Sequence, residues 1–222
     1  MEGDQTDAKN RGIQFVYEQW KNVTEHFRVS SSTRENWWRI IVRRYGEKWR
    51  FYHTMSHVQQ MLCLYQQWKE CIADLHTVCL AIFFHDIVYD PTSGNNELQS
   101  IVLFQKFAMD ANLPDAVSER VAGMISATIS HKANNPDDQD LCLFLDFDLS
   151  ILGQSAEVYE SYAEKIRQEY IHFSDESYRE GRVKVLQGLL SSPRLFISKE
   201  LGDLFEDQAR ENMRKEITSL QV

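Results

Sequence analysis

Glycine and proline are scarce in this chain of 222 residues, which contains 9 Gly and 4 Pro. The prolines lie between stretches of periodic hydrophobicity rather than inside them. Both residues are poorly tolerated in helix interiors, so this distribution is typical of a helical protein. No stretch alternates apolar and polar residues in the way that predicts a strand, and no internal repeat is evident.

Other absences narrow the class of protein. The four cysteines form no C-x-x-C pair, which argues against a zinc ribbon or a disulfide framework and favours reduced, buried thiols. The N-terminus, MEGDQTDAKNRG, has no apolar segment, and no later run reaches 18 apolar residues. We therefore expect a soluble, cytoplasmic protein without a membrane span. A net charge of -9 argues against general nucleic-acid binding.

Helical periodicity covers most of the chain. It predicts helices at residues 11–28, at 32–46 after a Ser32–Glu35 capping box, and on a stripe from His57 to Trp68. The segment LHTVCLAIFFHDIVY is apolar nearly all round and predicts the central helix of a bundle. Further helices are expected at 96–110, 115–130, 141–152, 155–173, 175–191 and 200–219. We expect one all-α domain over 1–222, with flexible residues 1–10 and C-terminal helices in 176–222.

Three sites carry imidazole or carboxylate groups on apolar helix faces: His57, the adjacent pair His85 and Asp86, and Asp148 in LDFDLS. A charged carboxylate in such a setting costs several kcal/mol unless it is paired, hydrogen-bonded or bound to metal. A single histidine on an apolar face is usually a satisfied core residue. Three such sites on separate helices instead favour a shared metal site.

This ordered set resembles the H…HD…D signature of the HD-domain metal-dependent phosphohydrolases, a helical superfamily that cleaves phosphate esters. R-x-Y-H-x-x-x-H, F-H-D-x-V-Y-D, N-E-x-x-S and D-x-D-L-S-I-L-G are similar to the motifs of its short, stand-alone predicted members over about residues 35–175, the expected metal-site core. YHTMSHV and HDIVYDPTSGNN also resemble motifs of cyclic-nucleotide phosphodiesterases. Val88 and Tyr89 replace the Asp-His pair of those enzymes, so their second-metal arrangement is not implied. The glutamine that grips the nucleotide in those enzymes has no counterpart here, so a cyclic-nucleotide substrate is not implied either.

The resemblance implies a divalent metal ion bound by His57, His85, Asp86 and Asp148. Two imidazoles and two carboxylates suit Mn, Fe, Zn, Co or Mg and do not choose among them. Asp146 lies two residues from Asp148 and should point to the opposite side of a helix, where it would orient a ligand or pair with a cation.

Five further residues are candidates for catalysis or substrate binding. His53, one helical turn before the expected ligand His57, resembles the proton donor of the phosphodiesterases. Glu97 would orient or deprotonate water, or complement a helix dipole. His131 would complete a second metal site or bind phosphate, or occupy a polar helix terminus. Arg50 and Lys132 would bind phosphate oxygens, or remain solvated charges.

These residues predict a phosphohydrolase that uses a metal-activated water to cleave a phosphate ester of a small metabolite, a nucleotide or nucleotide-like compound. Two alternatives remain. One is a di-iron oxygenase of the HD type, for which His131 would supply an added ligand. The other is a non-catalytic helical module that keeps one metal and binds a partner. The C-terminal helices would supply packing or a homo-oligomer face.

Overall fold

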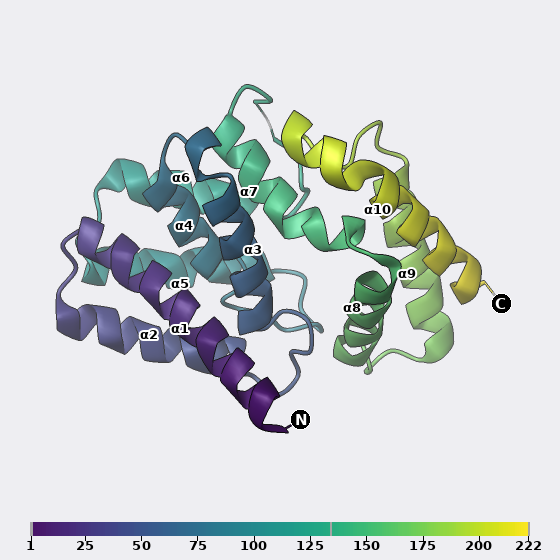
Figure 1. The fold of residues 1–222 in the computed structure, drawn as a ribbon, viewed down its shortest axis with the longest axis horizontal. Coiled ribbons are helices and arrows are strands. Elements are labelled where there is room, and N and C mark those ends of the chain that lie inside the picture. The colour runs from purple at the N-terminus through teal and green to yellow at the C-terminus, as the bar shows by residue number, and fades with distance from the viewer. Residues whose placement is uncertain (1, 134, 222) are drawn as a thin grey trace. The chain divides into compact units, whose positions relative to one another are not determined.

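Helices form the regular structure of this chain (Figure 1). The computed structural model describes residues 2–133 and 135–221, with side chains from residue 11 onward. These residues contain no strand, which confirms the predicted all-α class. The Cα positions group into two units, residues 1–132 and 133–222. The expectation of a single domain stays a prediction.

Unit 1 is organised around helix α4. Its helices are α1 (Glu2–His26), α2 (Ser31–Tyr45), α3 (Met55–Gln67), α4 (Leu75–Phe84), α5 (Asn96–Asp110) and α6 (Asp115–Ala127), with a short 3-10 turn, η1 (Lys69–Cys71). Every residue of α4 from Thr77 to Phe84 is buried, and the helix packs against α1, α3, α5 and α6. The predicted central helix is therefore confirmed.

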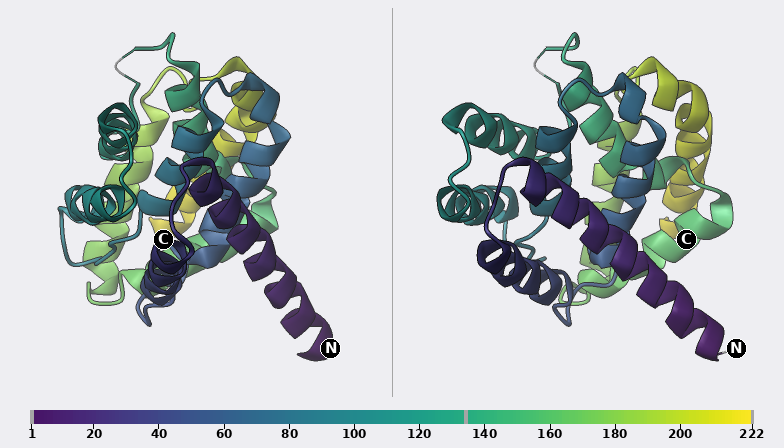
Figure 2. Two further views of the ribbon diagram at one scale, coloured as in Figure 1. Left: turned by 90° about the vertical axis from the view of Figure 1, so that its left-hand side faces the viewer. Right: turned by 60° about the vertical axis from the view of Figure 1, so that its left-hand side comes forward.

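Aromatic side chains hold α4 in place. The ring of Trp20 on α1 lies 5.3 Å from that of Phe83 and 5.1 Å from that of Phe107 on α5, measured between centroids. The ring of Trp37 on α2 lies 6.0 Å from that of Phe84. Each buried aromatic removes a large apolar area from water, so this cluster contributes strongly to the position of α4. Figure 2 shows the N-terminal end of α1 extending beyond the other helices of unit 1.

Several helix boundaries differ from those predicted. Helix α1 begins at Glu2 rather than at residue 11. The predicted capping box on Ser32 is wrong, because the Oγ of Ser30 accepts the hydrogen bond from the Thr33 amide. Helix α4 ends at Phe84, before the predicted Tyr89. Helix α3 begins at Met55, so His53 does not share a helix with His57, contrary to expectation.

Unit 2 contains α7 (Gln139–Leu149), the 3-10 turn η2 (Ser150–Gly153), α8 (Ala156–Glu169), α9 (Asp175–Leu190) and α10 (Lys199–Leu220). The carboxylate of Glu216 on α10 accepts hydrogen bonds from the Tyr159 hydroxyl on α8 and from the Arg182 guanidinium on α9. Such a satisfied polar network specifies how three helices meet. Among the described residues of either unit, no helix has the length and hydrophobicity needed to cross a bilayer.

The contact of η2 with α10 requires a glycine at position 153. A Cβ atom built on Gly153 would lie 2.4 Å from the Cβ of Phe205 and 2.6 Å from the Phe205 carbonyl oxygen. Backbone cannot yield as a flexible side chain does. A methyl group at this position must therefore push η2 and α10 apart.

Gly153→Ala is expected to lower the free energy of unfolding by about 1–3 kcal/mol, the usual cost of overpacking. The matched control is Gly188→Ala, at an exposed position inside α9 where an added Cβ meets nothing within 4 Å. That change should raise stability by about 0.5–1 kcal/mol, because alanine loses less conformational freedom in a helix. Urea denaturation measures both changes, and equal stability of Gly153→Ala and wild type would contradict the close packing.

Candidate metal centre

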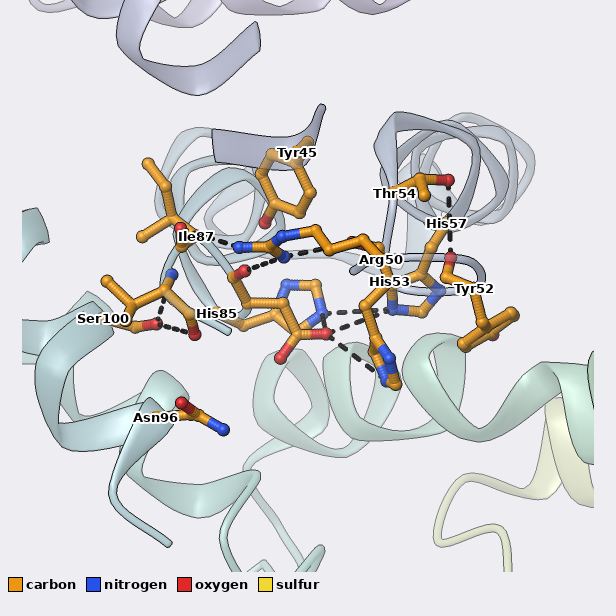
Figure 3. Close-up of polar contacts among 12 residues, drawn as sticks. Tyr45, Arg50, Tyr52, His53, Thr54, His57, His85, Ile87, Asn96 and Ser100 are labelled. Atoms are coloured by element: carbon orange, nitrogen blue, oxygen red, sulfur yellow. Dashed lines mark hydrogen bonds and ion pairs between the residues drawn. The ribbon is translucent and has the colours of Figure 1, made fainter. Parts of the chain in front are cut away.

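Three ligand atoms converge in unit 1. The Nε2 atoms of His57 and His85 lie 3.1 Å apart. The Oδ2 atom of Asp86 lies 3.2 Å from the Nε2 of His85 and 3.8 Å from that of His57. Figure 3 shows the two imidazole rings turned toward each other. The structure thus brings together three of the four predicted metal ligands, from segments that are distant in sequence.

Helix ends deliver these side chains. His57 occupies the first turn of α3, behind the N-cap Thr54, whose Oγ1 accepts a hydrogen bond from the Ser56 amide. His85 is the C-cap of α4, and Asp86 is the first residue beyond it. Residues at helix ends are not constrained by the i to i+4 ladder on both sides. Because Asp86 lies beyond the helix, its side chain can turn toward the point that the His85 ring faces.

A backbone carbonyl selects the tautomer of His85. The Nδ1 atom of this ring lies 2.9 Å from the carbonyl oxygen of Ile82. A carbonyl only accepts hydrogen bonds, so Nδ1 carries the proton and the Nε2 lone pair faces the cluster. Metal-binding histidines commonly have a hydrogen bond of this kind on the other ring nitrogen.

The separations within the cluster fit a single metal ion. Imidazole nitrogen and carboxylate oxygen lie about 2.1 Å from zinc or similar cations. Two ligands of one ion are therefore at most about 4.2 Å apart, and all three measured separations are shorter. The donor set of two nitrogens and one carboxylate is suited to a borderline divalent metal and leaves positions for other ligands.

The cluster is closed on the histidine side and open on the aspartate side. His57 and His85 are 2% and 1% exposed, whereas the Asp86 side chain is 18% exposed. The His53 side chain is 20% exposed, and its Nε2 lies 4.0 Å from the Oδ2 of Asp86. The open side of the cluster is therefore formed by Asp86 and His53. The ring of Tyr89 stacks on that of His53, with 4.3 Å between centroids.

Arg50 has a role that differs from the predicted one. Its side chain has no exposed surface, and its Nε atom donates to Glu47. Its Nη1 atom donates to the carbonyl oxygens of His53 and Asp86, at 3.0 and 2.7 Å, and its Nη2 atom donates to that of Ile87 at 3.1 Å. A guanidinium enclosed in this way cannot reach a phosphate, so the structure corrects the prediction that Arg50 binds substrate.

The three-residue cluster does not include the other predicted residues of unit 1. Glu97 is half-buried in the first turn of α5, as expected of a carboxylate that complements a helix dipole. His131 follows α6 with a φ of 48°, a conformation that histidine tolerates better than most residues. Lys132 is exposed. Catalytic or phosphate-binding roles for these three residues stay predictions.

The two aspartates of LDFDLS lie on α7 in unit 2. Asp148 is half-buried, and its role as a fourth ligand stays a prediction. Asp146 is fully buried and binds the segment before α10: Oδ1 accepts from the Ile197 amide at 2.8 Å, and Oδ2 accepts from the Ser198 amide and hydroxyl. Burial raises the pKa of Asp146 to about 6, although these three hydrogen bonds lower it. Its observed role is to hold the start of α10.

Asp146→Asn is expected to destabilise the protein by about 1–3 kcal/mol. Asparagine offers one acceptor oxygen in place of two, so one of the two backbone amides loses its partner. Asp203→Asn is the control, because Asp203 is exposed on α10 and pairs with the exposed Lys199. Chemical denaturation should show little change for this control. Equal losses in the two variants would contradict the structural role of Asp146.

Three contacts of the turn after α4 were not foreseen. The Oγ of Ser100 accepts from the Val88 amide and donates to the Val88 carbonyl. The Oδ1 of Asn96 accepts from the Asp90 amide, and its Nδ2 donates to the Asp90 carbonyl. Trp49 Nε1 donates to the Tyr89 carbonyl at 2.7 Å. The N-E-x-x-S motif contains Asn96 and Ser100, so a signal was present, but sequence alone did not connect it to this turn.

Comparisons with known proteins find no family model and no curated protein that matches this chain. The function is therefore argued from the residues of the site.

Proposed function

We propose that this protein is a metal-dependent phosphohydrolase that cleaves a phosphate ester of a small metabolite, a nucleotide or nucleotide-like compound. The observation that carries the proposal is the convergence of His57 Nε2, His85 Nε2 and Asp86 Oδ2 within 3.8 Å of one another. The resemblance of the surrounding motifs to those of HD-domain phosphohydrolases supports the choice of reaction.

His57, His85 and Asp86 would hold the metal, and Asp148 is proposed as a fourth ligand on the D-L-S motif alone. A divalent cation supplies two effects in phosphate-ester hydrolysis: it lowers the pKa of bound water toward about 7 and polarises the phosphoryl group. The protein's part is to orient the ligands. The buried His85, fixed by the Ile82 carbonyl, presents its lone pair in one direction.

His53 is proposed to donate a proton to the leaving oxygen of the ester. It is the partly exposed imidazole beside Asp86, and it does not need to act as a ligand in order to reach a bound ester. Its ring is oriented by the stacked Tyr89 and by the hydrogen bond that its own carbonyl accepts from Arg50. A fixed orientation brings the donor toward the reacting group before the reaction starts.

We infer that the protein works in the cytoplasm. Its four cysteines, Cys63, Cys71, Cys79 and Cys142, are all free thiols in the structure. Burial raises the pKa of Cys142 to about 11, which keeps this thiol protonated and unreactive. Unpaired cysteines are typical of reducing compartments.

Elemental analysis of purified protein tests the metal site. Wild type should contain one or more divalent metal ions per chain, and His85→Ala and Asp86→Ala should lose the metal while remaining folded by circular dichroism. His172→Ala, which removes an exposed histidine of unit 2, should keep the metal. Phosphate release from a panel of nucleotides, with the identified metal restored, should disappear in the same two variants.

The outcomes separate the competing functions. Two irons per chain with oxygen consumption and no phosphate release would favour a di-iron oxygenase. Bound metal without turnover on any ester of a broad panel would favour a non-catalytic module. A wild-type protein that binds no divalent metal under any loading condition would rule out the proposal.

His53→Ala separates proton donation from metal binding. The variant should retain the metal content of wild type, and its kcat for phosphate release should fall by about 100-fold to 10,000-fold, the usual contribution of a general acid. An ester with a better leaving group, such as a nitrophenyl phosphate, should be affected less because it needs less protonation. Loss of metal in this variant would instead make His53 a ligand.

A further inference from the structure

The segment that follows α4 is held almost entirely by side chains. Residues 86–90 form neither helix nor strand, and each of their five carbonyl oxygens accepts a hydrogen bond from a side chain. The donors come from before and after the segment in sequence: Arg50, which binds the first two carbonyls, then Ser100, Trp49 and Asn96. We call this segment the ligand turn, because it contains Asp86 and follows His85.

Arg50 makes the largest contribution to this arrangement. Its guanidinium binds two carbonyls of the ligand turn, those of Asp86 and Ile87. Ile87 is completely buried, so water cannot replace a lost donor there. A buried carbonyl without a partner costs about 1–3 kcal/mol, which the turn would avoid by moving.

The same guanidinium also holds the segment that carries His53. Its Nη1 atom donates to the carbonyls of both His53 and Asp86. These two residues carry the proposed proton donor and one of the proposed ligands. Figure 3 shows Arg50 between the His53 segment and Ile87 of the ligand turn. One side chain therefore links the backbone of His53 to that of Asp86.

The surroundings of Arg50 select arginine over lysine. Glu47 accepts from Nε, and the aromatic rings of Tyr45 and Tyr89 lie 5.1 and 5.4 Å from the guanidinium carbon. A planar fork with donors in several fixed directions can bind three carbonyls and a carboxylate while it contacts aromatic rings. A lysine ammonium has three donors at a single point and cannot span these acceptors.

We propose that Arg50 is a positioning residue, which sets the ligand turn and His53 in the geometry that metal binding and proton donation require. This inference rests on the proposed function, because it assumes that His57, His85 and Asp86 bind metal. It differs from that function in assigning a residue that touches neither metal nor substrate. Loss of the fork should loosen the turn by itself, with the rest of unit 1 in place.

The test compares Arg50→Lys with Arg34→Lys. Arg34 is also largely buried and paired with glutamate, but it lies at the other end of α2 from Tyr45, about 16 Å along the helix axis. Titration calorimetry with Mn²⁺ alone measures the metal affinity of wild type and both variants. Hydrogen exchange followed by mass spectrometry measures protection of residues 86–90 without any metal.

Arg50→Lys is expected to bind Mn²⁺ about 10-fold to 100-fold more weakly than wild type, the usual effect of removing a residue that orients metal ligands. Exchange should accelerate in residues 86–90 and remain unchanged in α1. Arg34→Lys should lower the melting temperature yet bind Mn²⁺ as wild type does. Glu47→Ala removes the carboxylate that holds Nε and so frees the guanidinium to move away from the carbonyls. It should weaken Mn²⁺ binding in the same direction and serves if Arg50→Lys does not fold.

Two results would overturn the inference while leaving the proposed function intact. One is wild-type Mn²⁺ affinity in folded Arg50→Lys, or in Glu47→Ala if Arg50→Lys does not fold. The other is an equal loss of affinity in Arg34→Lys, which would show a general loosening of unit 1. Absence of Mn²⁺ binding by wild type would overturn the metal site and the inference together. The wild-type titration alone shows this outcome, so it is distinguished from the two results above.

Discussion

Hydrogen bonding at the C-terminal end of α4 is the constraint on which the organisation of unit 1 depends. A helix leaves its last carbonyls without partners, and α4 ends inside an apolar core where water does not substitute. The carbonyl of Ile82 is bound by the His85 ring and that of Phe83 by the Tyr45 hydroxyl. Arg50, Ser100, Trp49 and Asn96 continue the series through residue 90. Two of the three candidate metal ligands, His85 and Asp86, thus belong to the segment that ends the helix.

This arrangement explains how a polar cluster exists beside so large an aromatic core. The imidazoles of His57 and His85 are buried and hydrogen-bonded, and the carboxylate of Asp86 reaches partly into solvent. An ion held there would have fixed donors on one side and access on the other. Rigid ligands on one side and an open approach on the other are what a catalytic metal site requires.

The sequence predicted the helices better than the places where they end. The apolar run of α4 was clear, but Ile87 and Tyr89 are buried as well, so hydrophobicity continues beyond the last helical residue and cannot mark Phe84 as the end.

His57, His85 and Asp86 could be grouped because their residue types share one chemistry. The role of Arg50 could not be predicted, because it depends on carbonyls that only the folded chain brings together. The two-residue spacing of Asp146 and Asp148 led us to expect that Asp146 would orient a ligand or pair with a cation. Its carboxylate instead binds the Ile197 and Ser198 amides and the Ser198 hydroxyl, and the role of Asp148 stays a prediction.

The attachment of Asp146 also determines the rotation of α7 about its own axis. Both carboxylate oxygens of Asp146 are bound by the backbone immediately before α10, at Ile197 and Ser198. Successive residues of an α-helix are about 100° apart around the axis, so Asp148 is directed about 200° away from Asp146. The loop that leads into α10 therefore helps to set the direction of the Asp148 side chain. A change in the length of that loop would therefore be expected to turn Asp148 to a new direction without any substitution at the candidate ligand positions.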